Sequence, residues 1–392
     1  MSPHKYLRIL FVPLLLLSVY SALAKTYAVG VCVPKAVVFT SIQAAVNGVP
    51  PGSVIKVCPN NWYEQVRITQ PLTLEGVVTG NYARPVIAVP LIGGLEINVT
   101  SQVTGVFENY FARFAAQVLV QTPGPVNITG ITVDGARGDL GCSSSLEWIA
   151  GIFYDTGSTG TVNRVTTRNQ LDEGCGNGVW VEDSTDGTQT ITIENSSVHD
   201  FDGTGIFVGT VGYDGWLTAT IKGNSVDGAG GAAGIAPFFI TANVSNNIVT
   251  GGGTGIYDNS GPLANNNNIP FTTISNNTVA DVGTGIAAGW DSGSVIKSNI
   301  ISNASTGIDL QAIGITANNN TITKTAIAIE FECDTDSVTG NIINDSQAAY
   351  DRFSGTVSPA GTLLNVDAVF GSSCPPPPLQ RSKKPMAFAS RR

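Results

Sequence analysis

Ile221-Lys-Gly-Asn-Ser-Val226 and Val244-Ser-Asn-Asn-Ile-Val249 are two copies of a short phrase that decides the fold of this chain. Seven copies occur in the second half, and their fourth positions fall at 196, 224, 247, 277, 299, 320 and 341, in steps of 28, 23, 30, 22, 21 and 21 residues. A second phrase, Gly-Ile, keeps the same interval from Gly205-Ile206 to Gly307-Ile308. Self-similarity at such a period predicts stacked units that bury their apolar faces against one another.

The repeated Asn is best interpreted as scaffold. Asn tolerates the left-handed backbone that a coil corner needs, and stacked Asn side chains bond to one another and to the backbone. The 45 Gly and the many Asn, Thr and Ser residues suit tight turns and β-coils rather than helices. We therefore predict an all-β chain of stacked coils, with the Asn series as a corner ladder.

Residues 36–76 form an opening unit. Phe39–Val46 has the apolar spacing of a short helix, with Thr40 or Ser41 as its N-cap. Short strands are expected at residues 54–57, 66–68 and 72–74. A stack of coils has an open apolar end, so we expect this helix to be its N-terminal cap, with residues 30–76 as the cap and first coils. The aromatic stretch Phe107–Phe114 predicts a short helix or a packed loop.

The two ends differ from the repeats. Residues 1–24 predict a secretory signal peptide, with a basic start, an apolar stretch too short for a bilayer span, and a small-residue cleavage site at Ala22-Leu23-Ala24. Residues 375–392 begin with four Pro and end in basic residues, which predicts a disordered tail. We therefore expect one β-helix domain over 25–374, exported to the extracellular space or the periplasm.

The six cysteines fit an exported protein, because all lie beyond the predicted signal and their number is even. They are Cys32, Cys58, Cys142, Cys175, Cys333 and Cys374. Pairing of nearest neighbours (32–58, 142–175 and 333–374) is the simplest of the fifteen connectivities. No Cys-x-x-Cys pair occurs and one His remains after signal cleavage, so a zinc site has almost no ligands to use.

The charge balance of the predicted domain is acidic. Residues 25–374 contain 13 basic and 29 acidic residues, a net charge of −16. A nucleic-acid groove needs a basic face, so this class of partner is excluded. The same balance permits a cation site or a neutral sugar ligand. Only four basic residues lie between 169 and 374, namely Lys222, Lys297, Lys324 and Arg352.

The opening unit resembles a known family. The strings Phe39-Thr-Ser-Ile-Gln-Ala-Ala-Val46, Pro50-Pro-Gly52, Val54-Ile-Lys-Val-Cys-Pro59, Tyr63-Glu-Gln-Val66 and Leu72-Thr-Leu-Glu-Gly76 are similar to the cap shared by pectin methylesterases and bacterial β-helix repeat proteins. The likeness covers residues 30–350 and points to secreted, functionally unassigned bacterial members of the pectate-lyase-like superfold. It implies a single-stranded right-handed parallel β-helix, and the superfold hosts lyases, hydrolases, esterases, epimerases and non-enzymes.

Two enzyme families of this superfold are disfavoured by missing motifs. The chain lacks the Gln-Asp and Asp-Phe-x-Phe-Gly pattern of pectin methylesterases. It also lacks the Asp-Asp and Gly-His-Gly motifs of polygalacturonases. If the protein is an enzyme, the resemblance therefore favours a polysaccharide lyase over a hydrolase or an esterase.

One cluster of acidic residues surrounds the only His of the mature chain. Aligning the coils on Gly178 and Gly205 places Asp172 beside His199 and Glu173 beside Asp200. His199 would act as acid or base with Asp200 fixing its tautomer, and the carboxylates would equally suit Ca²⁺. Turn residues that bond their own backbone are the alternative. The candidate catalytic residues are Asp172, His199, Asp200, Asp202 and Arg168, where Arg168 is the candidate base and a salt bridge or loop anchor is its alternative role.

A second stack of rings and carboxylates follows the Gly-Ile strand. Its candidate substrate-binding residues are Tyr154, Asp155, Trp180, Glu182, Tyr213, Trp216, Tyr257, Asp258, Trp290 and Asp291, with Asp183, Asp309, Glu330 and Glu332 in the same stack. Rings stack on the apolar face of a pyranose while carboxylates accept hydrogen bonds from its hydroxyls. Rings that cap the apolar coil and acids that face water are the alternative.

Two functions follow from these patterns. The first is an exported protein that binds extracellular polysaccharide along its β-face, with catalysis undetermined. The second is a polysaccharide lyase that performs β-elimination on a uronate-containing glycan. We expect no cofactor, with Ca²⁺ as the one alternative left open, no nucleic-acid partner, no membrane contact after signal cleavage, and a monomer.

Overall fold

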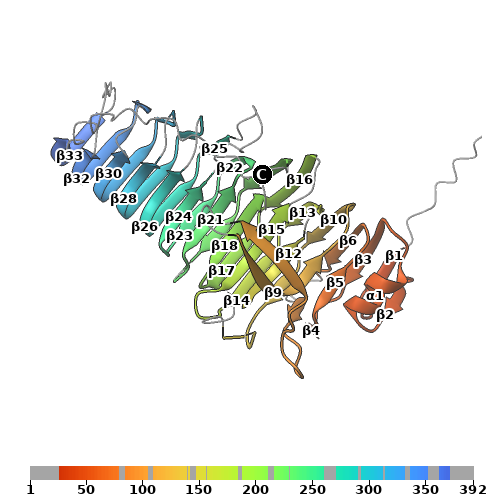
Figure 1. Ribbon diagram of the computed structural model, residues 1–392. Coiled ribbons are helices and arrows are strands. Elements are labelled where there is room, and N and C mark those ends of the chain that lie inside the picture. The colour runs from red at the N-terminus through yellow and green to blue at the C-terminus, as the bar shows by residue number, and fades with distance from the viewer. Residues whose placement is uncertain are drawn as a thin grey trace, which may run out of the picture.

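The computed structural model of the protein describes residues 26–78, 84–104, 109–138, 140–141, 147–155, 157–183, 188–210, 216–228, 230–259, 271–289, 293–311, 314–331, 336–351 and 362–370. The chain winds into an elongated right-handed parallel β-helix whose strands stack along one axis (Figure 1). Each coil contributes strands to one sheet and then to two columns of a second sheet. The predicted fold class is therefore confirmed.

The first sheet contains thirteen strands among the described residues. In spatial order they are β2 (Val37–Phe39), β1 (Thr26–Val29), β3 (Ser53–Val57), β6 (Leu72–Gly76), β10 (Pro125–Thr129), β13 (Thr159–Asn163), β16 (Thr188–Glu194), β19 (Trp216–Lys222), β22 (Thr241–Ser245), β25 (Thr272–Ser275), β27 (Val295–Lys297), β29 (Thr316–Asn318) and β31 (Ser337–Thr339).

The second sheet forms two columns that merge toward the C-terminal end. The first column contains β4 (Asn61–Tyr63), β7 (Val86–Ala88), β11 (Thr132–Asp134), β14 (Thr166–Gln170), β17 (Ser197–Phe201), β20 (Ser225–Asp227) and β23 (Ile248–Thr250). The second contains β5 (Val66–Ile68), β9 (Asn109–Val120), β12 (Glu147–Tyr154), β15 (Gly176–Asp183), β18 (Thr204–Thr210), β21 (Ala233–Phe238) and β24 (Thr254–Asp258). Five longer strands then serve both columns: β26 (Thr278–Gly289), β28 (Ile300–Gln311), β30 (Thr321–Phe331), β32 (Ile342–Asp351) and β33 (Thr362–Phe370).

The interior is one continuous apolar core, because alternate residues of every strand point inward. In the first sheet the registered positions Ile193, Ile221, Val244, Ile274 and Ile296 stack directly on one another, and all are fully buried. Each such side chain contributes about 1.5–3 kcal/mol of burial free energy. A coil can bury this row only against its two neighbours, as the repeat predicts.

The Gly of the Gly-Ile phrase is required by close packing between coils. A Cβ atom built on Gly255 would lie 2.7 Å from the carbonyl oxygen of Gly285 in the next coil. The stacked glycines therefore let neighbouring coils approach to strand-pairing distance at the start of the second column.

The predicted Asn ladder is present at the corner between the first sheet and the first column. Asn224, Asn247, Asn277, Asn299, Asn320 and Asn341 are all almost completely buried. The Asn247 side chain donates to the Ile221 carbonyl (2.9 Å) and to Oδ1 of Asn277 (2.9 Å). Its own Oδ1 accepts from the backbone N–H of Asn224 (2.9 Å) and from the Asn224 side chain (3.0 Å). Every polar atom of the amide thus has a partner in a neighbouring coil.

The left-handed residue of this corner is the one before each ladder Asn. Asn246, Asn276, Ser298 and Asn319 have φ of 54–57°, and Gly223 and Gly340 have φ of 65° and 66°, whereas the ladder residues themselves have ordinary backbone conformations. The corner therefore divides two properties of Asn between adjacent positions: one supplies the left-handed backbone and the next supplies the buried amide.

The predicted helical cap is present at the N-terminal end of the stack. Helix α1 (Ile42–Gly48) begins after Ser41, whose Oγ accepts from the backbone N–H of Ala44 (3.1 Å). Ile42, Ala45 and Val46 are buried on the first coils.

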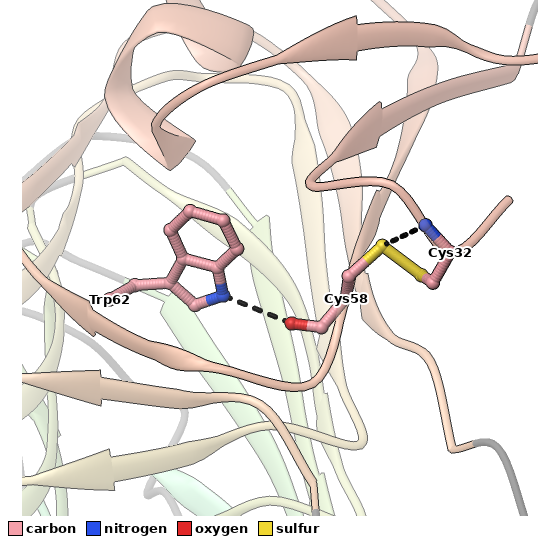
Figure 2. The surroundings of a disulfide bond; sticks show 3 residues. All are labelled: Cys32, Cys58 and Trp62. Atoms are coloured by element: carbon pink, nitrogen blue, oxygen red, sulfur yellow. Dashed lines mark hydrogen bonds between the residues drawn. A yellow bond between two sulfur atoms is a disulfide. The ribbon is translucent and has the colours of Figure 1, made fainter.

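A disulfide joins Cys32 to Cys58, with a Cα–Cα distance of 5.7 Å, as nearest-neighbour pairing predicts (Figure 2). The indole N–H of Trp62 donates to the Cys58 carbonyl beside it (3.0 Å). Cys175 is also disulfide-bonded, while Cys142, Cys333 and Cys374 lie outside the described residues.

One segment departs from the parallel stack. Strand β8 (Val99–Thr104) pairs antiparallel with the first half of β9, in a hairpin at the second column. The expectation of a helix or loop over Phe107–Phe114 was wrong where the structure describes it, because residues from 109 onward belong to β9. The predicted signal peptide (1–24) and tail (375–392) lie outside the described residues. Among those described, no helix has the length and apolarity to cross a bilayer.

We expect Asn277→Ala to lower the stability of the whole stack. The substitution leaves buried donors and acceptors without partners in both neighbouring coils, at a cost of about 1–3 kcal/mol for each group. Asn276→Gly is the matched control, because a left-handed position accepts glycine without strain. Thermal unfolding followed by circular dichroism should show a clearly lower midpoint for Asn277→Ala alone. Equal midpoints for the two variants would contradict the role of the ladder.

Candidate functional site

The second column carries one row of side chains on its outer surface. These residues follow the Gly-Ile pair of each coil, or its equivalent, and point away from the core because side chains alternate along a strand. The row consists of Phe153, Trp180, Phe207, Ala236, Tyr257, Ala287, Asp309, Glu330 and Asp351. Along the axis of the β-helix it changes from aromatic to acidic.

An open cavity of about 590 Å³ lies over the middle of this row. Its lining extends from β12 to β28, which are seven neighbouring strands and span about 29 Å at about 4.8 Å per strand. We call it the ring groove, and define it by six rings and three polar side chains: Trp148, Trp180, Phe207, Phe238, Phe239, Tyr257, Glu182, Asp309 and Gln311. Its volume is in the range of ligand-binding pockets.

The rings of the groove form an unbroken run along its floor. Trp180 and Phe207 are stacked at a centroid distance of 3.9 Å, with 14° between their planes. Phe238 lies 5.4 Å from Phe207 and 5.4 Å from Tyr257, in tilted and edge-on arrangements. Trp148 meets the edge of Trp180 at 5.4 Å. Trp180 is almost fully buried, whereas the other five rings keep part of their surface exposed.

The aromatic end of the groove is buttressed by the β8–β9 hairpin. Val99 of β8 and Phe114 of β9 belong to the same buried cluster as Trp180, and Trp148 packs against that cluster. Phe114 lies 5.0 Å from Trp180 and 5.3 Å from Trp148 between ring centroids. The hairpin thereby fixes the orientation of the first two rings of the groove.

Carboxylates supply the charged groups of the groove. The Trp180 indole N–H donates to Oε2 of Glu182 (3.3 Å), and the Gln311 amide donates to Oδ2 of Asp309 (2.5 Å). Burial, and then the charges of Asp309 and Asp258, raise the pKa of the Tyr257 hydroxyl. That hydroxyl therefore stays protonated and is available as a donor. Among the lining residues that the structure describes, none is Lys, Arg or His.

Three of the predicted substrate-binding residues, Trp180, Glu182 and Tyr257, line the ring groove. Asp155, directly after β12, accepts from the Gln121 amide (2.5 Å). Tyr213, Trp290 and Asp291 lie outside the described residues. Trp216 begins β19, and its side chain lies outside them too.

Two predicted residues point the other way. Tyr154 is fully buried in the main core and donates to the Val126 carbonyl (2.9 Å). Asp258 is fully buried and accepts from the Ser294 hydroxyl (3.0 Å). Each lies one position past the outer row, and a shift of one residue moves a strand side chain to the opposite face. These two assignments to the groove surface were wrong for that reason.

Several groove residues escaped the sequence analysis, above all Phe207 and Phe238. Phe207 had a signal that was available: it follows Gly205-Ile206 directly, as Trp180 follows Gly178-Val179. Phe238 lies two positions after Ala236, the outer-row residue of its strand, and pairs with Gly209 of the preceding coil. The small Gly209 leaves room for a ring from the next coil, and only a correct register reveals that pair.

The predicted pairing of Asp172 with His199 was wrong. Strand pairing in the first column places Arg168 beside His199, and His199 beside Asp227. The first of these pairs corresponds to an offset of 31 residues between the two coils. In the second column the same two coils are offset by 27 residues, as Val179 pairs with Ile206. Four additional residues in the turn after β14 account for the difference, so an alignment made on the Gly-Ile phrase fails on the far side of that turn.

The predicted acidic residues of that turn bond to backbone groups. Oδ1 of the buried Asp172 accepts from the backbone N–H of Leu140 (2.9 Å) and of Gly141 (2.8 Å). Asp202, from the next coil, accepts from the backbone N–H of Asp172 and of Gly176, both at 2.8 Å. These contacts anchor the inserted turn.

The remaining predicted catalytic residues lie on the outer face of the first column. Arg168 bonds to Oδ2 of Asp134 through both Nε and Nη2, each at 2.9 Å, which is the salt bridge considered as its alternative role. His199 Nδ1 lies 2.7 Å from Oδ2 of Asp200. Arg168, Asp134 and Arg137 also line a smaller cavity of about 320 Å³. Within the described residues, no group of three or more His, Cys, Asp or Glu side chains is arranged to hold a metal ion.

Comparisons with known proteins agree on the fold. A family model described as a right-handed beta helix region matches residues 210–357. No curated protein matches the chain in sequence.

Among solved structures, a family 28 exopolygalacturonase from Yersinia enterocolitica superposes with a TM-score of 0.51 at 11% identity, covering 85% of this chain and 74% of that one. The A-module of a mannuronan C-5 epimerase from Azotobacter vinelandii gives 0.50 at 15% identity, covering 86% and 94%. A mannuronic-acid-specific family 6 polysaccharide lyase from human gut microbiota gives 0.54 at 12% identity, covering 88% and 82%. The predicted pectate-lyase-like β-helix fold is confirmed, and identities this low establish the fold alone.

The Asp134–Arg168 contact predicts a pH dependence of stability. Burial alone would raise the pKa of Asp134, but hydrogen bonds from Asn169 and Ala136 and the contact with Arg168 outweigh it and lower the pKa below 3.8. A lowered folded-state pKa stabilises the fold above the unfolded-state pKa, and this contribution is lost as pH falls through the folded value. The stability difference between wild type and Asp134→Asn should therefore shrink under strongly acidic conditions. A difference that does not change with pH would contradict the assignment.

Proposed function

We propose that the ring groove binds a segment of extracellular polysaccharide. The observation that carries the proposal is the continuous run of partly exposed rings along the floor of an open cavity. Pyranose rings have apolar faces of C–H groups, and flat aromatic rings offer a matching surface. A soluble protein rarely leaves such a run uncovered without a binding role.

The polar groups of the groove suit the hydroxyls of a sugar. Glu182 and Asp309 are acceptors for charge-assisted hydrogen bonds, while the Tyr257 hydroxyl is a donor. The groove also runs along several coils, so an extended chain would contact rings and acids in succession. One neighbour in fold is a mannuronan epimerase and another is a mannuronic-acid-specific polysaccharide lyase, which supports the proposal by analogy of fold.

We also infer that the protein is exported. The Cys32–Cys58 disulfide supports an oxidising compartment, as does the bonded state of Cys175. The predicted signal peptide agrees with this inference. Sequencing the N-terminus of the exported protein should find Lys25 first, and retention of residues 1–24 would contradict it.

Truncation of the central rings tests glycan binding. A screen on a glycan array identifies a ligand, and titration calorimetry then measures its affinity for wild type, Phe238→Ala and Tyr257→Ala. Each variant should lose about fivefold or more in affinity, since removal of an interface ring costs about 1 kcal/mol or more. Phe271→Ala is the matched control, because Phe271 is an exposed ring just before β25 of the first sheet. No array signal, or equal affinities for all four proteins, would overturn the proposal.

A lyase is the second candidate, and one observation favours it. Arg137 and Arg168 line the smaller cavity together with Tyr63, and side chains of these types serve as proton acceptors or donors in β-elimination. The five residues chosen from the sequence, Asp172, His199, Asp200, Asp202 and Arg168, remain predictions for this activity. Elimination creates an unsaturated uronate that absorbs ultraviolet light. The test is therefore absorbance on pectate, alginate and chondroitin, with and without Ca²⁺, and no signal on any substrate would exclude this candidate.

A further inference from the structure

We propose that the ring groove selects glycans without carboxylate groups, and that it favours amino-bearing sugars over neutral ones. The inference rests on the proposed function, because it names the class of glycan that the groove accepts. It follows from the sign and the position of the charges around the rings.

The charged side chains in the described lining of the groove are both acidic. Glu182 lies at the aromatic end and Asp309 at the opposite end. Beyond Asp309 the outer row continues in register with Glu330 on β30 and Asp351 on β32. Strands are about 4.8 Å apart, so a glycan that leaves the rings in this direction meets three carboxylates in succession.

Three basic side chains of the described residues pair with carboxylates on other surfaces. Arg168 pairs with Asp134 on the first column, and Lys222 pairs with Glu194 on the first sheet (3.1 Å). A second pair on the first sheet joins Lys56 and Glu75 (2.6 Å). Two arginines lie on the second column beyond the aromatic end of the groove, where Arg113 of β9 pairs with Glu147 and Arg67 of β5 donates to the Gln121 amide oxygen (2.6 Å). The acidic end of the groove, on β28 to β32, lies away from these five basic residues.

These charges discriminate between three kinds of sugar. A uronate would bring a second carboxylate against Glu182 or Asp309, and like charges at short range repel more strongly where water is partly excluded. A neutral sugar donates hydroxyl hydrogens to the same oxygens. A protonated amino sugar donates up to three hydrogens and adds opposite charge. The expected order of affinity is amino sugar, then neutral sugar, then uronate.

The test compares oligosaccharides of equal length and linkage that consist of glucosamine, glucose or glucuronate. Titration calorimetry on the full exported chain is carried out at mildly acidic pH and low salt. Glucosamine should bind tightest and glucuronate weakest, and added salt should weaken glucosamine binding far more than glucose binding. Glucuronate binding as tight as that of glucose would overturn the inference.

One substitution assigns the preference to the acidic end. Asp309→Asn keeps the size of the side chain and an oxygen that can accept from Gln311, but removes the charge. It should reduce glucosamine affinity about tenfold while changing glucose affinity by less than about threefold. Asp227→Asn is the control, since Asp227 is an exposed carboxylate on the first column. An equal loss for both sugars would mean that Asp309 acts through packing and would overturn the charge assignment.

The outcomes separate this inference from the proposed function. If glucose binds and responds to Phe238→Ala but the order of the three sugars differs, the specificity fails and the groove remains a glycan site. If none of the three sugars binds and the array is blank, both proposals fail together.

Discussion

The buried amides of the Asn ladder hold one coil of this protein in register with the next. Strand pairing alone permits a coil to slip. The hydrogen-bond pattern of parallel strands repeats along their length, and the aliphatic core side chains resemble one another. Each interior ladder Asn donates and accepts within the two adjacent coils, as Asn247 does with Asn224 and Asn277. A slipped coil would bury those groups without partners, at a cost of about 1–3 kcal/mol for each group. The ladder therefore specifies the stack, while the aliphatic rows supply most of its burial free energy.

Register at this corner decides what appears on the opposite side of the coil. Once a coil is fixed, the residue after its Gly-Ile pair must point outward on the second column. The outer row is thus a direct consequence of the scaffold, and its members are free to vary because none contributes to the main core. Rings occupy the row at Phe153, Trp180 and Phe207, which pack with the β8–β9 hairpin, and again at Tyr257. Carboxylates occupy it further along, at Asp309, Glu330 and Asp351. A uniform scaffold therefore carries a surface that is polar at one end and aromatic at the other.

The sequence predicts those parts that depend on the repeat. The coil architecture, the helical cap, the ladder and the Cys32–Cys58 disulfide were all predicted correctly, because each follows from spacing or from adjacent residues. The errors arise where spacing changes. Tyr154 and Asp258 were placed one residue from the outer row, and that single step turns them into the core. The pairing of Asp172 with His199 failed because the turn after β14 contains four additional residues. A turn insertion leaves no mark in the apolar pattern on either side, so only the strand pairs locate it.

Fold likeness and charge lead to different expectations about the ligand, and the charge pattern is the more informative of the two. The epimerase and lyase neighbours share the winding of the chain at 12–15% identity, and this winding is set by the ladder and the core, neither of which touches the groove. In the glycan site that we propose, ligand choice would depend instead on the outer row. There, acidic residues face the rings while Arg168, Lys222 and Lys56 are paired on other surfaces. A polyuronate carries a carboxylate on every sugar, and the described lining of the groove contains no basic side chain to pair with it. The same β-helix scaffold can therefore carry an acidic groove rather than a basic one, without any change to the interactions that hold its coils together.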